Sequence, residues 1–168
     1  MKRVWITVLL LSTLLFADSG SDRTTRALDN SPEELAKESF RTLVSAYLDK
    51  DIETFMDQVS EEKFQQDYIT FDDAIRQDFR VYNLLHLNYW FDQITPDGEN
   101  LIYMKVRWNK EYESITSSKL HRKLGVSWFL FIKSDKTYKL IGMAGQAMWG
   151  ESRNEWLQET PISTHKIR

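Results

Sequence analysis

The sequence predicts an α+β domain in which N-terminal helices pack on a curved antiparallel sheet of about four long strands. Two patterns lead to this prediction. Before residue 79, apolar residues recur at every third or fourth position, which is typical of one face of a helix. From Phe79 to Trp149 they alternate with a period of two, which is typical of strands with one buried face. Helices followed by a run of strands indicate two layers around one core.

The first predicted helix has a well-specified start. Ser31 suits the N-cap, Pro32 suits the first helical position, and Glu34 completes a capping box. Its apolar face consists of Leu35, Ala36, Phe40, Leu43, Val44, Tyr47 and Leu48. Asp51 then predicts the N-cap of a second helix, and Thr70 that of a third, short helix. The apolar residues of these two helices are Ile52, Phe55, Met56 and Val59, and Phe71, Ala74 and Ile75.

Four predicted strands follow, separated by turn signals. They cover residues 79–91, 101–112, 120–132 and 138–149, and Thr95–Gly98 is the first turn. Gly142 and Gly145 permit a bend or bulge in the last strand. The side predicted to face the helices consists of Phe79, Val81, Leu85, Leu87, Tyr89 and Phe91, then Ile102, Met104, Val106 and Trp108, then Leu120, Leu124, Val126, Trp128, Leu130 and Ile132.

The corner between the first two helices resembles that of a known superfamily. Residues 46–51, Ala-Tyr-Leu-Asp-Lys-Asp, join a long helix directly to a short one, and long strands come late in the chain. In this respect residues 31–150 resemble the cystatin-like α+β cone of the nuclear-transport-factor-like superfamily, which includes polyketide-cyclase-like and ketosteroid-isomerase-like proteins. The resemblance implies that a site would lie in the cavity between the concave sheet face and the helices.

The N-terminal residues 1–19 predict an export signal. Lys2 and Arg3 precede a short apolar run, and the small residues of 17–19 suit cleavage before Gly20. The run is shorter than the roughly 20 apolar residues of a membrane span, so cleavage is favoured over an anchor. We therefore expect a periplasmic or secreted protein with no stable membrane anchor after cleavage.

The remaining organisation is a flexible leader at 20–30, one domain at 31–150 and a C-terminal tail at 151–168. Cleavage would remove two basic residues and one acidic residue, which changes the formal charge from −3 to −4. A chain with this mild negative balance is not expected to bind nucleic acid. The sequence has no Cys, so the fold must depend on its hydrophobic core rather than on disulfides.

The familiar signatures of catalysis and metal binding are missing from the sequence. His86, His121 and His165 lie far apart and there is no Cys ligand, so neither a metal nor another cofactor is predicted. There is no phosphate-binding loop and no nucleophile motif. The resemblance implies an Asp or His base with a Tyr or Asp donor in the enzymes of the superfamily. No Asp or Glu lies mid-strand on the predicted apolar side, so no catalytic residue is assigned.

Two groups of residues are candidates for binding. Those expected to line the cavity are Tyr47, Asn83, Trp108 and Trp128. For Tyr47 and Asn83 the alternative is a buried Tyr with a satisfied hydroxyl and a polar residue near a strand end. Those expected on the outer sheet face, for ligand binding or for a homodimer, are Tyr82, His86, Trp90, Tyr103, Arg107 and His121. Here the alternative is an ordinary outer surface on which Lys and Arg stems cover aromatic rings.

The predicted function is therefore an exported, non-catalytic binding or accessory domain. It would hold a small ligand or an envelope protein in the cavity or on the outer sheet face. One alternative is an isomerase-like or cyclase-like enzyme that acts on an apolar substrate in the cavity, with a base supplied by His86 or by an acid elsewhere. A further alternative is a purely structural subunit.

Overall fold

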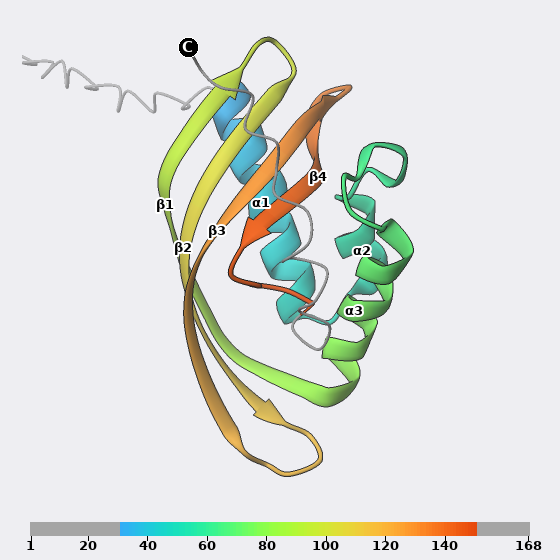
Figure 1. Cartoon of the computed structure of the whole chain (residues 1–168), viewed down its shortest axis with the longest axis vertical. Coiled ribbons are helices and arrows are strands. Elements are labelled where there is room, and N and C mark those ends of the chain that lie inside the picture. The colour runs from blue at the N-terminus through green and yellow to red at the C-terminus, as the bar shows by residue number, and fades with distance from the viewer. Residues whose placement is uncertain (1–30, 151–168) are drawn as a thin grey trace, which may run out of the picture.

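Helices precede a four-stranded antiparallel sheet in the computed structural model, which describes residues 31–150 (Figure 1). The predicted signal, leader and tail lie outside the described residues. The elements are α1 (Pro32–Leu48), α2 (Ile52–Asp57), a 3-10 turn at Glu61–Lys63, α3 (Tyr68–Val81), β1 (Tyr82–Asp97), β2 (Leu101–Ser114), β3 (Leu120–Ser134) and β4 (Thr137–Gly145). The strands lie in the order β1-β2-β3-β4, so the predicted α+β class is confirmed. Figure 1 shows the long, curved sheet with the helices on its concave side.

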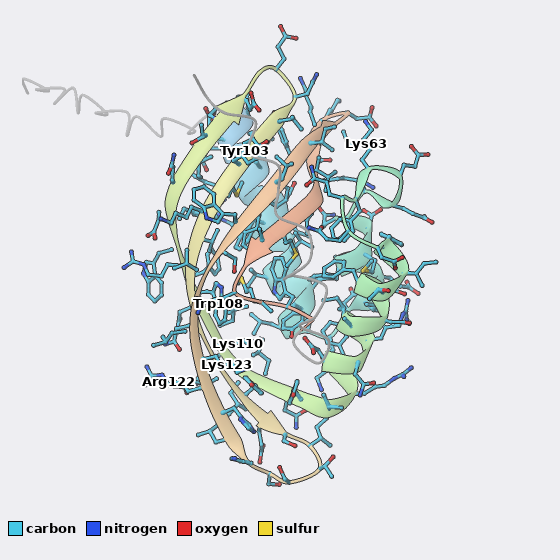
Figure 2. All side chains as sticks on the ribbon, in the orientation of Figure 1. Lys63, Tyr103, Trp108, Lys110, Arg122 and Lys123 are labelled. Carbon is cyan, nitrogen blue, oxygen red and sulfur yellow. The ribbon has the colours of Figure 1, made fainter. Side chains whose placement is uncertain are left out.

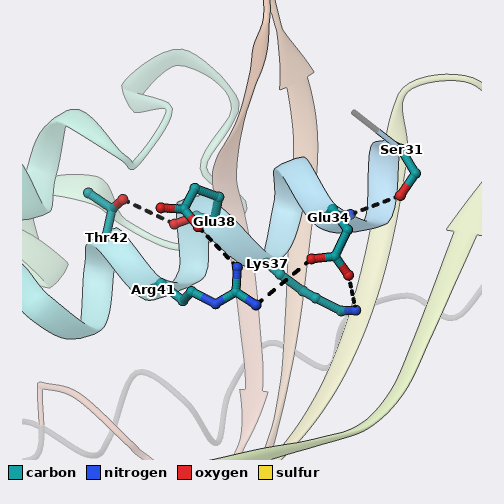
Figure 3. A network of polar contacts seen from close by, with 6 residues as sticks. All are labelled: Ser31, Glu34, Lys37, Glu38, Arg41 and Thr42. Atoms are coloured by element: carbon teal, nitrogen blue, oxygen red, sulfur yellow. Dashed lines mark hydrogen bonds and ion pairs between the residues drawn. The ribbon is translucent and has the colours of Figure 1, made fainter. Parts of the chain in front are cut away.

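The start of α1 is capped as the sequence predicts. The Glu34 backbone N–H donates to the Ser31 Oγ at 3.3 Å, which satisfies one of the free N–H groups of the first turn. Figure 3 shows how Glu34 also pairs with Lys37 and Arg41, and how Arg41 donates to Glu38 at 3.0 Å. These pairs lie on the solvent side of α1, where each contributes little to stability.

The opposite face of α1 forms the centre of the core. The Phe40 ring meets the rings of Tyr89, Phe91 and Phe129 edge-on, with centroids 5.1, 5.3 and 5.1 Å away. Aromatic pairs in this geometry add stability beyond the area they bury. Phe40 thus fixes α1 against both β1 and β3.

The third helix is longer than predicted, at both ends. Asp67, rather than Thr70, is the N-cap, and its carboxylate accepts from the Thr70 N–H. The helix continues to Val81, so the predicted strand start at Phe79 is wrong. Phe79 and Val81 have side chains that suit strands, but Asp78 lies on the buried face with Phe71, Ala74 and Ile75. The three- and four-residue spacing of these buried side chains therefore keeps the chain helical as far as Val81.

Register shifts change which residues of β1 face the helices. The pairing of β1 with β2 slips between Leu84 and His86, so Leu85 is an extra, exposed residue. A bulge of this kind reverses the parity of side chains on its two sides. As a result Leu84 packs against the core, whereas Leu85, predicted to be buried, does not.

The predicted faces of β3 are inverted. Phe129 and Phe131 are fully buried, while Trp128 and Leu124 are exposed on the convex face. Gly125 lies under the Trp108 ring, where a Cβ atom would come within 2.3 Å of Trp108 Cζ2. The missing side chain at Gly125 therefore lets the largest ring of β2 lie flat against β3.

The last strand ends earlier than predicted. The pairing of β3 with β4 shifts beside Gly142, as expected there, but β4 stops at Gly145 instead of Trp149. Gly145 has φ +93°, and a Cβ atom would lie 2.7 Å from the Val126 carbonyl oxygen. This turn directs the next residues, 146–150, back into the interior.

Candidate functional site

A buried polar pair joins α1 to α3. The Tyr47 hydroxyl donates to Asp78 Oδ2 at 2.7 Å, and the Asp78 side chain is only 1% exposed. Burial, and then the negative charge of Asp78, raise the pKa of Tyr47 well above its usual value. Tyr47 therefore acts as a neutral donor to this carboxylate. The sequence analysis missed Asp78, although its spacing from Phe71 and Ile75 places it on the apolar face of the helix.

A buried lysine of β2 completes the group. Lys110 is 2% exposed, and its Nζ donates to the Met148 carbonyl oxygen at 2.9 Å. The ammonium group lies 5.5 Å from the Trp108 ring centroid and 5.4 Å from that of Tyr112, which are cation–π distances. Lys110 lies two residues after Trp108, and every second residue of β2 from Ile102 onward points inward. The alternation in the sequence could therefore have predicted that Lys110 is buried.

Burial controls the ionisation of this group. It lowers the pKa of Lys110 from 10.5 to about 8, although the charge of Asp78 acts in the opposite direction. Burial also raises the pKa of Tyr112 to about 12, with further contributions from Tyr82 and Asp78. An amine with a pKa of about 8 beside a carboxylate and a phenol is a chemically competent arrangement for proton transfer.

The space beside these groups is very small. It has a cavity volume of about 10 Å³, about what one water molecule needs, whereas pockets for small organic molecules are some 300–1,000 Å³. It is lined by Tyr47, Lys50, Asp78, Phe79, Tyr82, Leu84, Lys110 and Tyr112. This space therefore accepts a water or a single functional group, but not a whole substrate.

Trp149 occupies the centre of the interior. Its side chain is fully buried, with centroid distances of 5.6 Å to Phe40, 5.3 Å to Phe55 and 5.1 Å to Phe129. The sequence analysis placed Trp149 at the end of a strand. In the structure it instead fills the space between the helices and the sheet.

The predicted cavity residues separate into two groups. Tyr47 lines the small space, and Trp108 is buried, with its Nε1 donating to Ser127 Oγ at 2.7 Å. Asn83 is exposed and accepts a hydrogen bond from Lys50 Nζ at 3.0 Å. Trp128 lies on the convex face, where Lys105 Nζ is 5.5 Å from its ring centroid. The structure thus brings Tyr47 and Trp108 to the interior, but not Asn83 or Trp128.

The predicted outer-face residues also separate. The pairing of β1 with β2 places His86, Trp90, Tyr103 and Arg107 on the convex face. Tyr82 instead lines the small interior space. His121 is opposite Tyr112 and stacks on its ring, with centroids 5.1 Å apart and planes 6° apart. The bulge at Leu85 explains the position of Tyr82, and the inverted faces of β3 explain the position of His121.

The convex face carries an apolar stripe along β3, here called the outer stripe: Leu124, Val126, Trp128, Leu130 and Ile132, of which Leu130 is buried and only 2% exposed. Leu124 is 67% exposed and Trp128 is 36% exposed. Trp90 of β1, 51% exposed, lies on the same face. Because Phe129 and Phe131 are also buried on the concave face, β3 is apolar on both of its sides.

Comparison with known proteins identifies the fold. Neither a protein-family model nor a curated protein sequence matches the chain. Among solved structures, a ketosteroid isomerase-like protein from Erwinia carotovora atroseptica is similar, with a TM-score of 0.58 and 9% identity over 68% of this chain and 94% of that one. An NTF-2 like protein of unknown function from Shewanella oneidensis gives a TM-score of 0.53 and 10% identity over 66% and 95% of the two chains. The chain has an NTF2-like fold.

In this NTF2-like cone, the Tyr47–Asp78–Lys110 group lies on the concave side, and the outer stripe lies on the convex side. Within residues 31–150, no group of three or more His, Asp or Glu side chains is arranged to hold a metal ion. In the same range, no helix is both long and apolar enough to span a bilayer.

Tyr47→Phe is expected to lower the free energy of unfolding by about 1.5–3 kcal/mol, because it removes a hydrogen bond to a buried charged group. Urea unfolding at neutral pH measures this change. Tyr103→Phe, on the convex face, is the matched control, and its unfolding free energy should stay within about 0.5 kcal/mol of the wild type. Equal effects of the two substitutions would show that the Tyr47 hydroxyl contributes nothing specific.

Proposed function

We propose that this NTF2-like chain is an exported, non-catalytic binding domain that holds a protein partner on the outer face of its sheet. The observation that supports this is the outer stripe. An antiparallel strand with one face in water ordinarily alternates apolar and polar residues, but β3 does not. The exposed members of the stripe, Leu124 and Trp128, form apolar surface of the kind that marks contact sites, and Trp90 and Arg107 beside them are of types enriched in interfaces.

The partner that this face fits best is a second copy of the same chain. Arg107 donates to Asp92 at 2.7 Å, and Arg122 lies 3.3 Å from Glu111, so most cations of this face already have a carboxylate beside them. Two copies of a face with balanced charges do not repel each other. Such a self-complementary patch suits a two-fold symmetric dimer.

Trp128→Asp is expected to weaken dimerisation by at least about tenfold, because it would bury an unpaired charge at the centre of the contact. Sedimentation equilibrium over a range of concentrations measures the dissociation constant. Ile69→Asp, which alters an exposed apolar residue of α3, is the matched control and should leave it unchanged. A wild-type protein that stays monomeric at high concentration would contradict the choice of a second copy as partner.

Export rests on the N-terminal pattern of Lys2 and Arg3 followed by an apolar run. Expression of the full chain in a bacterial host should yield a periplasmic protein whose mass corresponds to a start near Gly20. Recovery of the uncleaved chain from the cytoplasm would remove this part of the proposal.

A second candidate function is an isomerase-like or cyclase-like enzyme, and one observation favours it. Asp78 and Tyr47 are a carboxylate and a phenol in direct hydrogen-bonding contact on the concave side. The binding function is the better supported of the two, because the space beside Asp78 has a volume of only about 10 Å³. Turnover of an apolar ketone that Asp78→Asn abolishes would reverse this ranking.

A further inference from the structure

One turn of the sheet carries exposed apolar side chains, although turns are usually polar. The chain passes from β2 to β3 through residues 115–119, and Ile115 and Leu120 at the two sides of this turn are 47% and 61% exposed. The other two turns of the sheet are polar, because residues 97–100 are Asp-Gly-Glu-Asn and residues 134–137 are Ser-Asp-Lys-Thr. Residues 115–120 are here called the β2–β3 tip.

Hydrogen bonds hold the β2–β3 tip in a defined shape. The Ser114 N–H donates to the Lys119 carbonyl oxygen at 3.0 Å, and the Ser118 N–H donates to the Ser114 carbonyl oxygen at 2.8 Å. The Ile115 N–H donates to the Val81 carbonyl oxygen at 2.9 Å, which ties the tip to the end of α3. The backbone of the tip is thus fixed, so its apolar side chains are exposed by the fold itself.

The tip lies at one end of the molecule, away from the other two turns. Figure 1 shows it at the lower end of the long axis, beyond α3, whereas the turns that join β1 to β2 and β3 to β4 lie at the upper end. A stable protein–protein contact buries about 800 Å² on each partner, which is more than a projecting turn with two apolar side chains offers. Such a turn is better shaped to enter the boundary between lipid headgroups and acyl chains.

Positive charge surrounds the tip. Residues 114–124 contain no acidic residue and three cations, Lys119, Arg122 and Lys123. All three side chains are exposed, and Figure 2 shows Arg122 and Lys123 on opposite sides of the sheet. Arg122 lies 3.3 Å from Glu111, but an ion pair at the surface is weak in water, and the Arg122 side chain is 64% exposed. Both faces of the sheet therefore carry a cation beside the tip.

The far end of the sheet has a different charge. Three cations and two carboxylates give residues 111–124 a formal charge of +1, whereas two carboxylates give residues 97–100 a formal charge of −2. A negatively charged surface therefore attracts the tip and repels the far end, which orients the molecule end-on. The turns at the far end contain no apolar residue, so a second copy offers the tip no apolar contact there.

We propose that the β2–β3 tip binds the surface of an anionic lipid bilayer. Ile115 and Leu120 enter the boundary region of the bilayer, and Lys119 contacts the lipid phosphates. The contact is peripheral and reversible, because two apolar side chains provide far less attraction than a membrane-spanning helix. It goes beyond the proposed function, since it uses the end of the sheet and leaves Trp128 on the convex face to the second copy.

A fluorophore attached to the tip measures this contact directly. The chain has no Cys, so Ser117→Cys, at an exposed position, can be labelled alone with nitrobenzoxadiazole, whose emission rises in apolar surroundings. Vesicles of equal parts phosphatidylglycerol and phosphatidylcholine should raise the emission, and vesicles of phosphatidylcholine alone should raise it far less. The same label on Lys136→Cys, in a turn at the far end, should not respond. Because the label reports its own surroundings, contact of another part of the chain with the vesicles leaves its emission unchanged.

Substitutions in the labelled protein separate the apolar and the charged contributions. Leu120→Ser should weaken vesicle binding at least about fivefold, because the exposed apolar side chain is lost. Ile69→Ser, at a position of α3 that is 73% exposed, is the matched control and should leave binding unchanged. Lys119→Gln should also weaken binding, by about fivefold at low salt, whereas Lys136→Gln should not.

Several outcomes overturn the proposal. One is a label at Ser117→Cys that does not respond to the anionic vesicles, which is also the result expected if the tip docks on an acidic protein instead. Another is equal binding to vesicles of phosphatidylcholine alone, or an equal response of the label at Lys136→Cys. A third is that Leu120→Ser binds as Ile69→Ser does, or that Lys119→Gln binds as Lys136→Gln does.

Discussion

Replacing Trp149 with alanine is expected to lower the free energy of unfolding by about 3–5 kcal/mol. The Trp149 side chain is fully buried among the rings of Phe40, Phe55 and Phe129, which come from α1, α2 and β3. Its removal leaves a cavity where all of these elements meet, and a close-packed interior relaxes only partly into such a space. The loss is therefore expected to be near the upper end for a single core substitution.

Trp149→Phe provides a second step in the same series. The indole Nε1 of Trp149 has no hydrogen-bond partner within residues 31–150, and a buried N–H without a partner is itself unfavourable. Phenylalanine keeps most of the ring contact and removes this group, so its loss of stability should be clearly smaller than that of alanine. Urea unfolding followed by circular dichroism gives both values. Trp90→Ala, at an exposed position, is the control, and a loss as large as that of Trp149→Ala would contradict this role of Trp149.

The architecture could be predicted because its signals are local. Ser31 and Asp51 cap the helices that the sequence predicts they cap, since a side-chain acceptor three residues before a free N–H needs no distant partner. The alternation within residues 101–108 likewise assigned the faces of β2 correctly, with Ile102 and Trp108 toward the helices. Helix caps and the alternation of apolar residues depend on residues only a few positions apart, so a single sequence is enough to predict them.

The assignment of β3 failed for a physical reason. With apolar residues on both faces, the alternation that normally selects the buried side is absent. The choice depends on packing: Phe129 meets the Phe40 ring, and Gly125 lets the Trp108 ring lie flat. Neither contact is visible within β3 alone, and therefore Trp128 was expected in the cavity.

Tyr47 was expected to line the cavity, but the rest of the candidate site was missed for a related reason. Tyr82 lies on the concave side because of a bulge at Leu85, and a single extra residue leaves no mark in the hydrophobic pattern. Asp78 and Lys110 are charged residues at positions whose period predicts burial. Burying a lone charged side chain is costly, so the sequence alone argues against burying either Asp78 or Lys110. Only the fold shows that α3 and β2 bring them together.

Lys110 is expected to make the protein more stable as the pH rises from 8 to 10. Burial lowers the pKa of Lys110 from 10.5 to about 8, so in this range the unfolded chain binds a proton that the folded chain has lost. Stability rises with pH wherever the unfolded state binds more protons, and the gain between pH 8 and 10 amounts to about 2 kcal/mol. The chain has no Cys, whose thiols would otherwise titrate in the same range.

The gain should stop near pH 10, because the tyrosines then act in the opposite direction. Burial raises the pKa of Tyr47 and of Tyr112, so above pH 10 the unfolded chain loses these phenolic protons first and stability falls. Urea unfolding at half-unit steps between pH 7 and 11 should therefore show a maximum near pH 10. Lys110→Met should remove most of the rise below pH 10, whereas Lys105→Met, on the convex face, should retain it. Parallel pH profiles for the wild type and Lys110→Met would mean that the buried amine does not titrate in this range, and that Asp78 holds it charged in the folded chain.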